Sequence, residues 1–303
     1  MDQAEGLRLL VKQFRGEVQP EIVFKQHDAL SSSRIIAVTS GKGGVGKTNL
    51  TLNLAISLAR DHGKRVLVLD ADFGTANVDI VLGMFPRYNI SHLFLENRSL
   101  EEIILVGPHD VKILPGVSGM ANLTSLTEGQ KMRFFDELEQ YQAKYALDYI
   151  LIDTGAGLSS NVTNFLLASD EIIVVVTPEP TSLSDAYAII KVMNQFNPDL
   201  KTNIVVNMAV SEESAKRVFN TLESVSDKFL NKTLNYLGFM RFDKHLPTAV
   251  RQQKPLVLSY PNSDVSIEIL RLAHSLDSKI DPQQKTMRNF FELATKYFGW
   301  NHD

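Results

Sequence analysis

Short runs of consecutive apolar residues alternate with longer stretches of helical periodicity along most of the chain. The apolar runs are Ile35–Val38, Val66–Leu69, Val111–Leu114, Tyr149–Ile152, Ile172–Val176, Ile204–Val206 and a run near Leu234–Phe239. Runs without polar alternation are typical of strands buried on both faces of a parallel sheet. Between them, sets such as Leu50, Leu54 and Leu58 repeat at helical spacing. This order predicts a doubly wound, mostly parallel α/β sheet with helices on both faces.

Both ends of the chain depart from this pattern. Met1–Arg15 carries apolar side chains on one face, which predicts a short helix, and the glycine, proline and serines of Gly16–Ser33 predict a linker. Beyond Pro282, a second helix is expected from apolar residues that share one helix face, namely Met287, Phe290, Phe291, Ala294 and Phe298. The sequence therefore predicts a helix and linker over residues 1–33, an α/β domain over 34–280 and an amphipathic helix over 281–303.

Composition narrows the class of protein. The chain has 303 residues, 31 Lys and Arg against 35 Asp and Glu, and a net charge of -4, which disfavours a protein that coats DNA through overall basic charge. It has no cysteine, which excludes disulfides, thiolate catalysis and iron–sulfur clusters. No apolar run reaches the ~18 residues of a spanning helix, and no signal peptide opens the sequence. We therefore expect a cytoplasmic protein.

A glycine-rich loop follows the first predicted strand and precedes a predicted helix. Ser40–Thr48 reads SGKGGVGKT, which fits the phosphate-binding pattern G-x-x-x-x-G-K-T in its required context. Backbone N–H groups of such a loop point at phosphate oxygens, and the helix N-terminus adds partial positive charge. Lys47 would bridge the β- and γ-phosphates, and the Thr48 hydroxyl would ligate Mg²⁺. The predicted ATP-binding residues of this segment are Gly41, Lys42, Gly43, Gly44, Val45, Gly46, Lys47, Thr48 and Asn49.

Carboxylates stand at the ends of two further predicted strands. Asp70 and Asp72 follow Val66–Leu69, and Asp153 follows Tyr149–Ile152. A carboxylate at such a position is costly unless a cation or a polar ligand faces it. Asp153 fits the acidic residue that holds Mg²⁺ directly or through water. The alternative is that an aspartate caps the helix that follows, and it applies to Asp70 more than to Asp72.

The phosphate loop contains a second lysine, Lys42, that an ordinary loop of this kind does not need. GKGGVGKT resembles the deviant Walker A motif of the MinD/ParA family of ATPases. The resemblance implies an ATP-dependent homodimer in which Lys42 touches the phosphates bound by the partner subunit; outside this motif, a solvated surface lysine would be expected. The segment from Asp70 to Asn77 resembles the family's switch I, which implies that Asp72 orients the attacking water and that Asp70 supports the Mg²⁺ shell.

Later segments agree with this resemblance. Asp153–Gly157 resembles switch II, with Gly155 at a position where the family often has proline. In similar proteins an asparagine placed like Asn207 binds the adenine amino group; a simple turn residue is the alternative. The segment from Asp243 to Pro255 resembles the loop and helix that flank the nucleotide. Together the motifs imply slow ATP hydrolysis, in which Lys42, Lys47 and Mg²⁺ stabilise the transferred phosphoryl group.

The first residues resemble a motif of one branch of this family. DQAEGLR, at Asp2–Arg8, is similar to the DQAxxLR motif of the FlhG proteins, also called FleN or YlxH. This resemblance implies that Gln3 and Arg8 contact the GTPase FlhF and that the protein regulates flagellar number or placement, with the C-ring proteins FliM, FliN or FliY as further partners. Any capped helix is the alternative for this segment. For the whole chain, the alternatives are MinD-type division-site placement with MinC and ParA-type DNA partitioning. The net charge and the aromatic C-terminus disfavour DNA partitioning.

The aromatic face of the last segment suggests contact with a membrane surface. Its large side chains are Phe290, Phe291, Phe298 and Trp300, and basic residues outnumber acidic ones nearby. Such a helix binds anionic membrane surfaces reversibly. We therefore expect a cytoplasmic protein that associates peripherally with the inner face of the cell membrane. The alternative is that this face packs on the protein's own core. Both can hold, if the helix docks on the core in the monomer and is released in the dimer.

Overall fold

The computed structural model describes residues 33–72, 77–116, 127–278 and 293. The chain divides into two compact units, residues 1–30 and 31–303, and all described residues belong to the second unit. The domain boundaries expected at residues 33 and 280 stay predictions. The predicted partner-binding and membrane-binding residues lie outside the described residues: Gln3, Arg8, Phe290, Phe291, Phe298 and Trp300.

The described part is built on one central sheet. Its strands lie in the order β3-β4-β2-β5-β1-β6-β7-β8, and every neighbouring pair is parallel except β3 and β4. The bounds are β1 Arg34–Thr39, β2 Val66–Ala71, β3 Leu105–Val106, β4 Lys112–Leu114, β5 Tyr149–Thr154, β6 Glu171–Val176, β7 Lys201–Ala209 and β8 Asn235–Arg241. The predicted mostly parallel sheet is confirmed, and each predicted strand is present. Only β3 was not predicted, because two residues are too short for a hydrophobic pattern.

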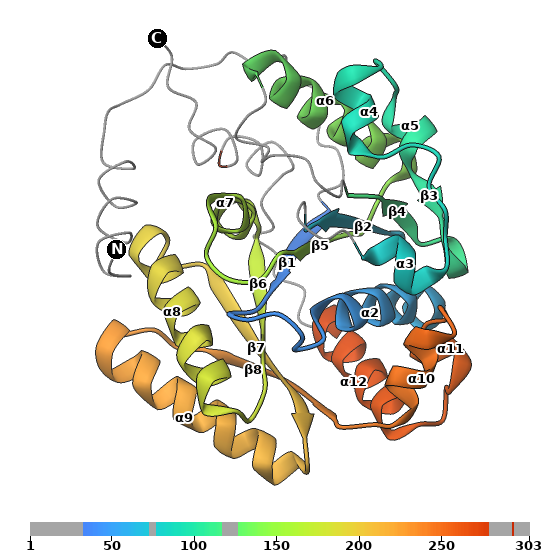
Figure 1. The fold of residues 1–303 in the computed structure, drawn as a ribbon. Coiled ribbons are helices and arrows are strands. Elements are labelled where there is room, and N and C mark those ends of the chain that lie inside the picture. Colours follow the sequence, from blue (N-terminus) through green and yellow to red (C-terminus); the bar gives the residue numbers. More distant parts are fainter. Residues whose placement is uncertain (1–32, 73–76, 117–126, 279–292, 294–303) are drawn as a thin grey trace. The chain divides into compact units, whose positions relative to one another are not determined.

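Helices cover both faces of the sheet (Figure 1). Figure 1 shows α2 and α12 on one side of the strands and α7, α8 and α9 on the other. The bounds are α2 Lys47–His62, α3 Val78–Leu82, α4 Ile90–Leu95, α5 Leu100–Ile103, the 3-10 turn η1 Pro108–Asp110, α6 Glu128–Tyr145, α7 Ser160–Ala168, α8 Pro180–Phe196, α9 Glu212–Leu230, α10 His245–Arg251, α11 Leu256–Ser259 and α12 Asp264–Ser278. The doubly wound arrangement is therefore confirmed.

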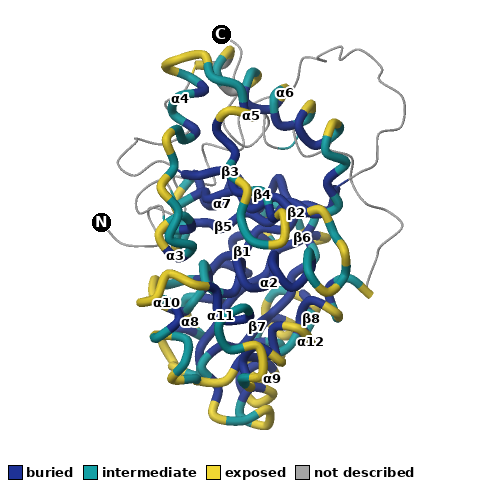
Figure 2. The backbone as a smooth tube through the Cα atoms, turned by 90° about the vertical axis from the view of Figure 1, so that its right-hand side faces the viewer, coloured by how far each residue is buried: buried dark blue, intermediate teal, exposed yellow. Residues whose placement is uncertain are grey.

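The strands form the core because they are covered on both faces. All six residues of β1, β2, β5 and β6 are buried, which explains their uninterrupted apolar runs. Leu50, Leu54 and Leu58 of α2 are also buried, in one cluster with residues of α12. Figure 2 shows the buried residues of the sheet in dark blue and the exposed residues, on loops and outer helices, in yellow.

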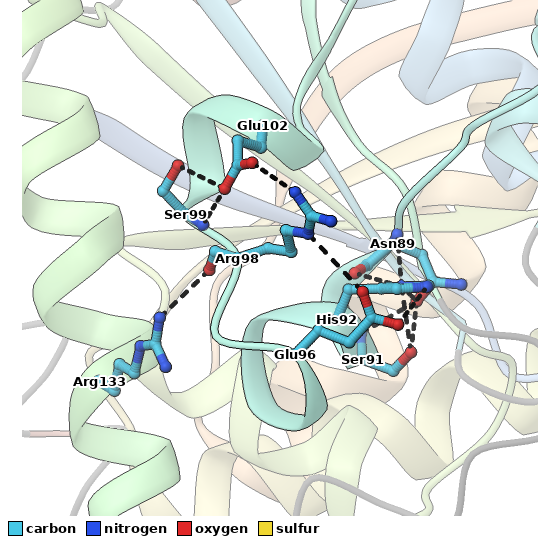
Figure 3. Close-up of polar contacts among 8 residues, drawn as sticks. All are labelled: Asn89, Ser91, His92, Glu96, Arg98, Ser99, Glu102 and Arg133. Carbon is cyan, nitrogen blue, oxygen red and sulfur yellow. Dashed lines mark hydrogen bonds and ion pairs between the residues drawn. The ribbon is translucent and has the colours of Figure 1, made fainter.

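The short helices α4 and α5 depend on side-chain caps. The Asn89 side chain accepts hydrogen bonds from the Ser91 N–H (3.0 Å) and hydroxyl (2.6 Å), and the Asn89 N–H donates to His92 Nδ1 at 3.1 Å (Figure 3). At the start of α5, the Ser99 N–H donates to the Glu102 carboxylate at 3.0 Å, and Arg98 pairs with the same side chain at 2.8 Å. Such capping lets helices of one or two turns form where periodicity alone predicts none.

Candidate functional site

The glycine-rich loop lies at the middle of the sheet. It connects the end of β1 to the start of α2, and β1 lies between β5 and β6. The chain continues to β2 on one side of β1 and returns to β6 on the other, so the loop is at the switch point where open α/β sheets bind ligands. Because these strands are parallel, the polar residues at the carboxyl ends of β2, β5 and β6 lie at the same edge of the sheet.

Close packing explains two of the glycines in this loop. A Cβ atom added at Gly41 would lie 2.2 Å from Asp185 Cβ of α8, so only glycine fits there. Gly46 has φ 91°, in the left-handed region, and a Cβ atom there would lie 2.5 Å from Asn207 Nδ2. By contrast, a Cβ atom at Gly43 would meet nothing within 4 Å.

Hydrogen bonds from the carboxyl ends of β5 and β7 hold the loop. The Gly157 N–H donates to the Ser40 carbonyl at 2.9 Å, which joins the loop to the predicted switch II. The Asn207 Nδ2 donates to the Val45 carbonyl at 2.7 Å, and its Oδ1 accepts the Met208 N–H at 2.7 Å. Asn207 therefore positions the loop in this structure, and its predicted contact with adenine stays a prediction.

Lys47 is the buried cation of the site. It is 8% exposed, and burial lowers its pKa, while the nearby carboxylates of Asp153 and Asp72 oppose that shift. A buried ammonium group needs negative charge close by. Phosphate oxygens above the loop would supply that charge, in agreement with the predicted role of Lys47.

Two buried carboxylates lie on adjacent strands, and one of them, Asp153, is close to this lysine. Asp70 of β2 and Asp153 of β5 are register partners, 1% and 2% exposed. Burial raises the pKa of Asp70 to about 7, the charge of Asp153 adds to that shift, and three backbone N–H groups oppose it. Burial also raises the pKa of Asp153 to about 6, against the hydrogen bond from Thr48 and the charge of Lys47.

This donor set fits a divalent cation. A cation beside the two carboxylates would favour their charged forms and lower both pKa values. Carboxylate and hydroxyl oxygens, which Asp153 and Thr48 offer, are ligands that Mg²⁺ prefers. Among the described residues, no group of three or more His, Asp or Glu side chains is arranged to hold a metal ion alone.

Asp70 also has a structural role. Its Oδ1 accepts the Asp72 N–H at 3.1 Å, and its Oδ2 accepts the N–H groups of Asn77 at 3.0 Å and Val78 at 3.1 Å. Asp70 thus fixes the beginning of α3, which is the alternative left open by the sequence. The metal roles of Thr48, Asp70 and Asp153 stay predictions.

The predicted switch segments meet at Asp72 and Gly155. A Cβ atom at Gly155 would lie 3.5 Å from Asp72 Oδ1, which places the carboxylate against the backbone after β5. Asp72 therefore lies at the same strand edge as Asp153, near the loop. Its predicted part in orienting water is compatible with this place and stays a prediction.

Lys42 forms an ion pair that the sequence analysis missed. Its Nζ contacts the Glu179 carboxylate at the start of α8 and lies 3.4 Å from Thr181 Oγ1. The two charged side chains are 32% and 61% exposed. Glu179 follows the apolar run Ile172–Val176, so the rule that singled out Asp70 and Asp153 would also have found it. In this structure Lys42 is held within its own subunit.

A family model described as an AAA domain matches residues 33–206, more than half of the chain. The antiactivator FleN of Pseudomonas aeruginosa is 37% identical over 254 residues, covering 84% of this chain and 90% of that protein. The flagellum site-determining protein YlxH of Helicobacter pylori is 34% identical over 278 residues, covering 90% of this chain and 93% of that protein.

Solved structures share the fold. The septum site-determining protein MinD from Pyrococcus horikoshii OT3, complexed with Mg-ADP, has a TM-score of 0.64 and 26% identity, covering 81% of this chain and 96% of that chain. MinD from Aquifex aeolicus has a TM-score of 0.65 and 26% identity, covering 82% of this chain and 99% of that chain.

The fold and the loop geometry define a P-loop protein of the doubly wound α/β class. The comparisons add the branch: the chain belongs to the MinD/ParA family of P-loop ATPases, in the FlhG group that includes FleN and YlxH. The resemblance first seen in Lys42 and in the switch segments is thereby confirmed at the level of the family.

Gly41→Ala is expected to destabilise the protein without any ligand. The new methyl group would collide with the backbone and Cβ of Asp185, which costs about 1–3 kcal/mol of unfolding free energy, as overpacking does. Urea denaturation in nucleotide-free buffer measures this. Gly43→Ala, in the same loop but in open space, is the matched control and should change stability by less than about 0.5 kcal/mol. Equal effects of the two substitutions would contradict the packing argument.

The nucleotide-free protein should lose stability as pH rises toward 8. The pKa of Asp70 is about 7 in the folded state, against 3.8 for an ordinary aspartate. The folded state therefore binds more protons between these two pH values, and its stability falls as pH rises through this range to 7. Asp70→Asn removes this dependence. From pH 5 to 8, the wild type should lose on the order of 2 kcal/mol of unfolding free energy relative to Asp70→Asn.

Urea denaturation at several pH values, without nucleotide or Mg²⁺, measures this difference. Any constant effect of the substitution on the cap of α3 cancels, because only the change with pH is compared. Asp79→Asn, a partly exposed carboxylate of the same helix, is the control. A pH-independent gap between wild type and Asp70→Asn would refute the assignment.

Proposed function

We propose that this protein is a Mg²⁺-dependent ATPase that acts as a molecular switch and regulates the number or placement of flagella. Its ATP-bound form would be a homodimer, and its ADP-bound form a monomer. The observation that carries the proposal is the pair of lysines in one phosphate loop, Lys47 buried beside Asp153 and Lys42 at the surface. The similarity to FleN and YlxH supports the flagellar role.

The reaction is the hydrolysis of ATP to ADP and phosphate. A water oxygen forms a bond to the γ-phosphorus, the bond from that phosphorus to the bridging oxygen of the β-phosphate breaks, and the water gives up a proton to the released phosphate. Thr48 and Asp153 would hold Mg²⁺, with Asp70 behind them, and the ion would supply positive charge to the phosphates. The loop N–H groups and Lys47 neutralise the charge that moves to the leaving oxygen.

Asp72 would orient the attacking water. Its carboxylate lies against Gly155, at the strand edge where the γ-phosphate would be. A carboxylate there accepts a hydrogen bond from the water but is a weak base, so the rate would be slow. A slow rate suits a switch, because the lifetime of the ATP-bound state then sets the duration of the signal.

Lys42 would connect hydrolysis to dimerisation. In a single subunit its ammonium group pairs with the exposed Glu179 carboxylate. An exposed ion pair of this kind contributes little stability, so the lysine can exchange partners at low cost. Phosphate oxygens bound by a second subunit carry more negative charge than one carboxylate, and they would draw Lys42 across the interface.

The two ends of the chain would deliver the signal. By resemblance to the FlhG motif, Gln3 and Arg8 would contact an FlhF-type GTPase, and C-ring proteins would be further partners. The C-terminal segment, with Phe290 and Trp300, would bind an anionic membrane surface. Two such helices in a dimer bind far more tightly than one, so ATP would control membrane residence. Within the described residues, no helix is long and apolar enough to cross a membrane.

Lys42→Ala should abolish ATP-dependent dimerisation while ATP binding remains. Its side chain is predicted to act on the phosphates of the other subunit, and Lys47 and the loop amides are unchanged. Light scattering after size exclusion, with a non-hydrolysable ATP analogue, should give a dimer for wild type and a monomer for the variant, and the hydrolysis rate should fall at least about tenfold. Lys191→Ala, an exposed lysine of α8, is the control. A dimeric Lys42→Ala would overturn the dimer mechanism.

The flagellar branch of the proposal is tested with a purified FlhF-type GTPase. A peptide of residues 1–15 should stimulate its GTP hydrolysis, and Gln3→Ala should remove the stimulation, because the side-chain amide is the group expected to position water. Gln13→Ala, the same change outside the motif, is the matched control. Absence of stimulation, together with binding to MinC or salt-dependent binding to DNA, would favour division-site placement or DNA partitioning instead.

A further inference from the structure

The five-residue helix α3 is held at both ends by side chains from other elements. At its start, the N–H groups of Asn77 and Val78 donate to Asp70 Oδ2 at 3.0 and 3.1 Å. Near its end, the Gln253 amide donates from Nε2 to the Ile80 carbonyl at 3.1 Å. A helix this short has little stability of its own. Its position therefore depends on these two attachments and on its packing.

Gln253 fits closely against the end of α3. The helix ends at Gly83, which has φ 62°, and a Cβ atom there would lie 3.1 Å from Gln253 Cβ and 3.3 Å from its carbonyl oxygen. Gln253 itself has φ 52°, an uncommon backbone conformation for a residue other than glycine, asparagine or aspartate. The strained turn between α10 and α11 thus brings the Gln253 amide to the end of this helix.

The turn that carries Gln253 is attached to the helix of the phosphate loop. The Val257 N–H of α11 donates to Asn53 Oδ1 of α2 at 3.0 Å, and Arg60 of α2 donates to the Val257 carbonyl at 2.9 Å. Asn53 also donates to the Asn49 carbonyl, in the first turn of α2, at 2.7 Å. A continuous series of contacts therefore runs from α2 through α11 and Gln253 to α3 and Asp70.

We propose that Gln253 is a positioning residue for switch I. By holding the end of α3, Gln253 keeps the N–H groups of Asn77 and Val78, at the start of this helix, on Asp70. The inference rests on the proposed ATP hydrolysis, in which Asp72 orients water. Gln253 itself touches neither the phosphate loop nor the predicted metal ligands.

The chain offers a matched pair of neighbouring glutamines for the test. Gln253→Glu keeps the size of the side chain but sets a carboxylate oxygen against the Ile80 carbonyl, so the donor is lost. Gln252→Glu makes the same change one residue earlier. Both residues are exposed, but within the described residues the side chain of Gln252 makes no hydrogen bond. Both variants alter the net charge equally.

Two measurements on the full chain are needed. Steady-state ATP hydrolysis with Mg²⁺ gives kcat and KM, and amide hydrogen exchange without nucleotide reports on the N–H groups of Asn77 and Val78. For Gln253→Glu we expect kcat to fall about five- to tenfold with KM within about twofold of wild type, as for the loss of one hydrogen bond. Exchange at these two amides should rise about tenfold. Gln252→Glu should match wild type in both measurements.

The outcomes separate this inference from the proposed function. If Gln253→Glu matches Gln252→Glu in kcat and in amide exchange, Gln253 has no positioning role. If KM rises and the melting temperature falls together with kcat, the residue is merely structural and the inference is overturned. If the wild type does not hydrolyse ATP, the proposed function fails, while the exchange of the Asn77 and Val78 amides still shows whether Gln253 holds α3.

Discussion

The charge balance between Lys47 and the buried carboxylate of Asp153, whose register partner is the buried Asp70, is the interaction on which the site depends. All three groups are at least nine-tenths buried, and burial disfavours the charged form of each of them. Ions bound beside these groups would favour their charged forms. Triphosphate oxygens and a divalent cation are the charges that would complete it, which is why a polar cluster this costly lies at the centre of an apolar sheet.

The elements around this centre are joined by few but well-placed hydrogen bonds. Gly157, after β5, and Asn207, in β7, bind the phosphate loop from its two sides, and Asp70 binds the start of α3. A change in the loop would therefore reach the predicted switch II directly, through the hydrogen bond from Gly157. This arrangement is what a nucleotide-dependent switch requires, because the two nucleotide states must differ in more than the loop itself.

Much of this could be predicted from the amino-acid sequence. Uninterrupted apolar runs are a consequence of burial on both faces, so the strands and their parallel arrangement follow from the pattern. Gly41–Thr48 and the aspartates at strand ends could be found because their chemistry requires fixed spacing along one segment. The short helices α3 and α4 could not, because caps from Asp70 and Asn89 stabilise them rather than periodicity.

The sequence by itself determined the sheet, the phosphate loop and the class of ligand, because each depends on residues close together in the chain. Only the tertiary structure decided which distant residues meet. It placed Glu179 on Lys42, Asp185 against Gly41 and Gln253 at the end of α3. These contacts join residues more than a hundred positions apart, and no local pattern encodes them, because they arise from how strands and helices pack.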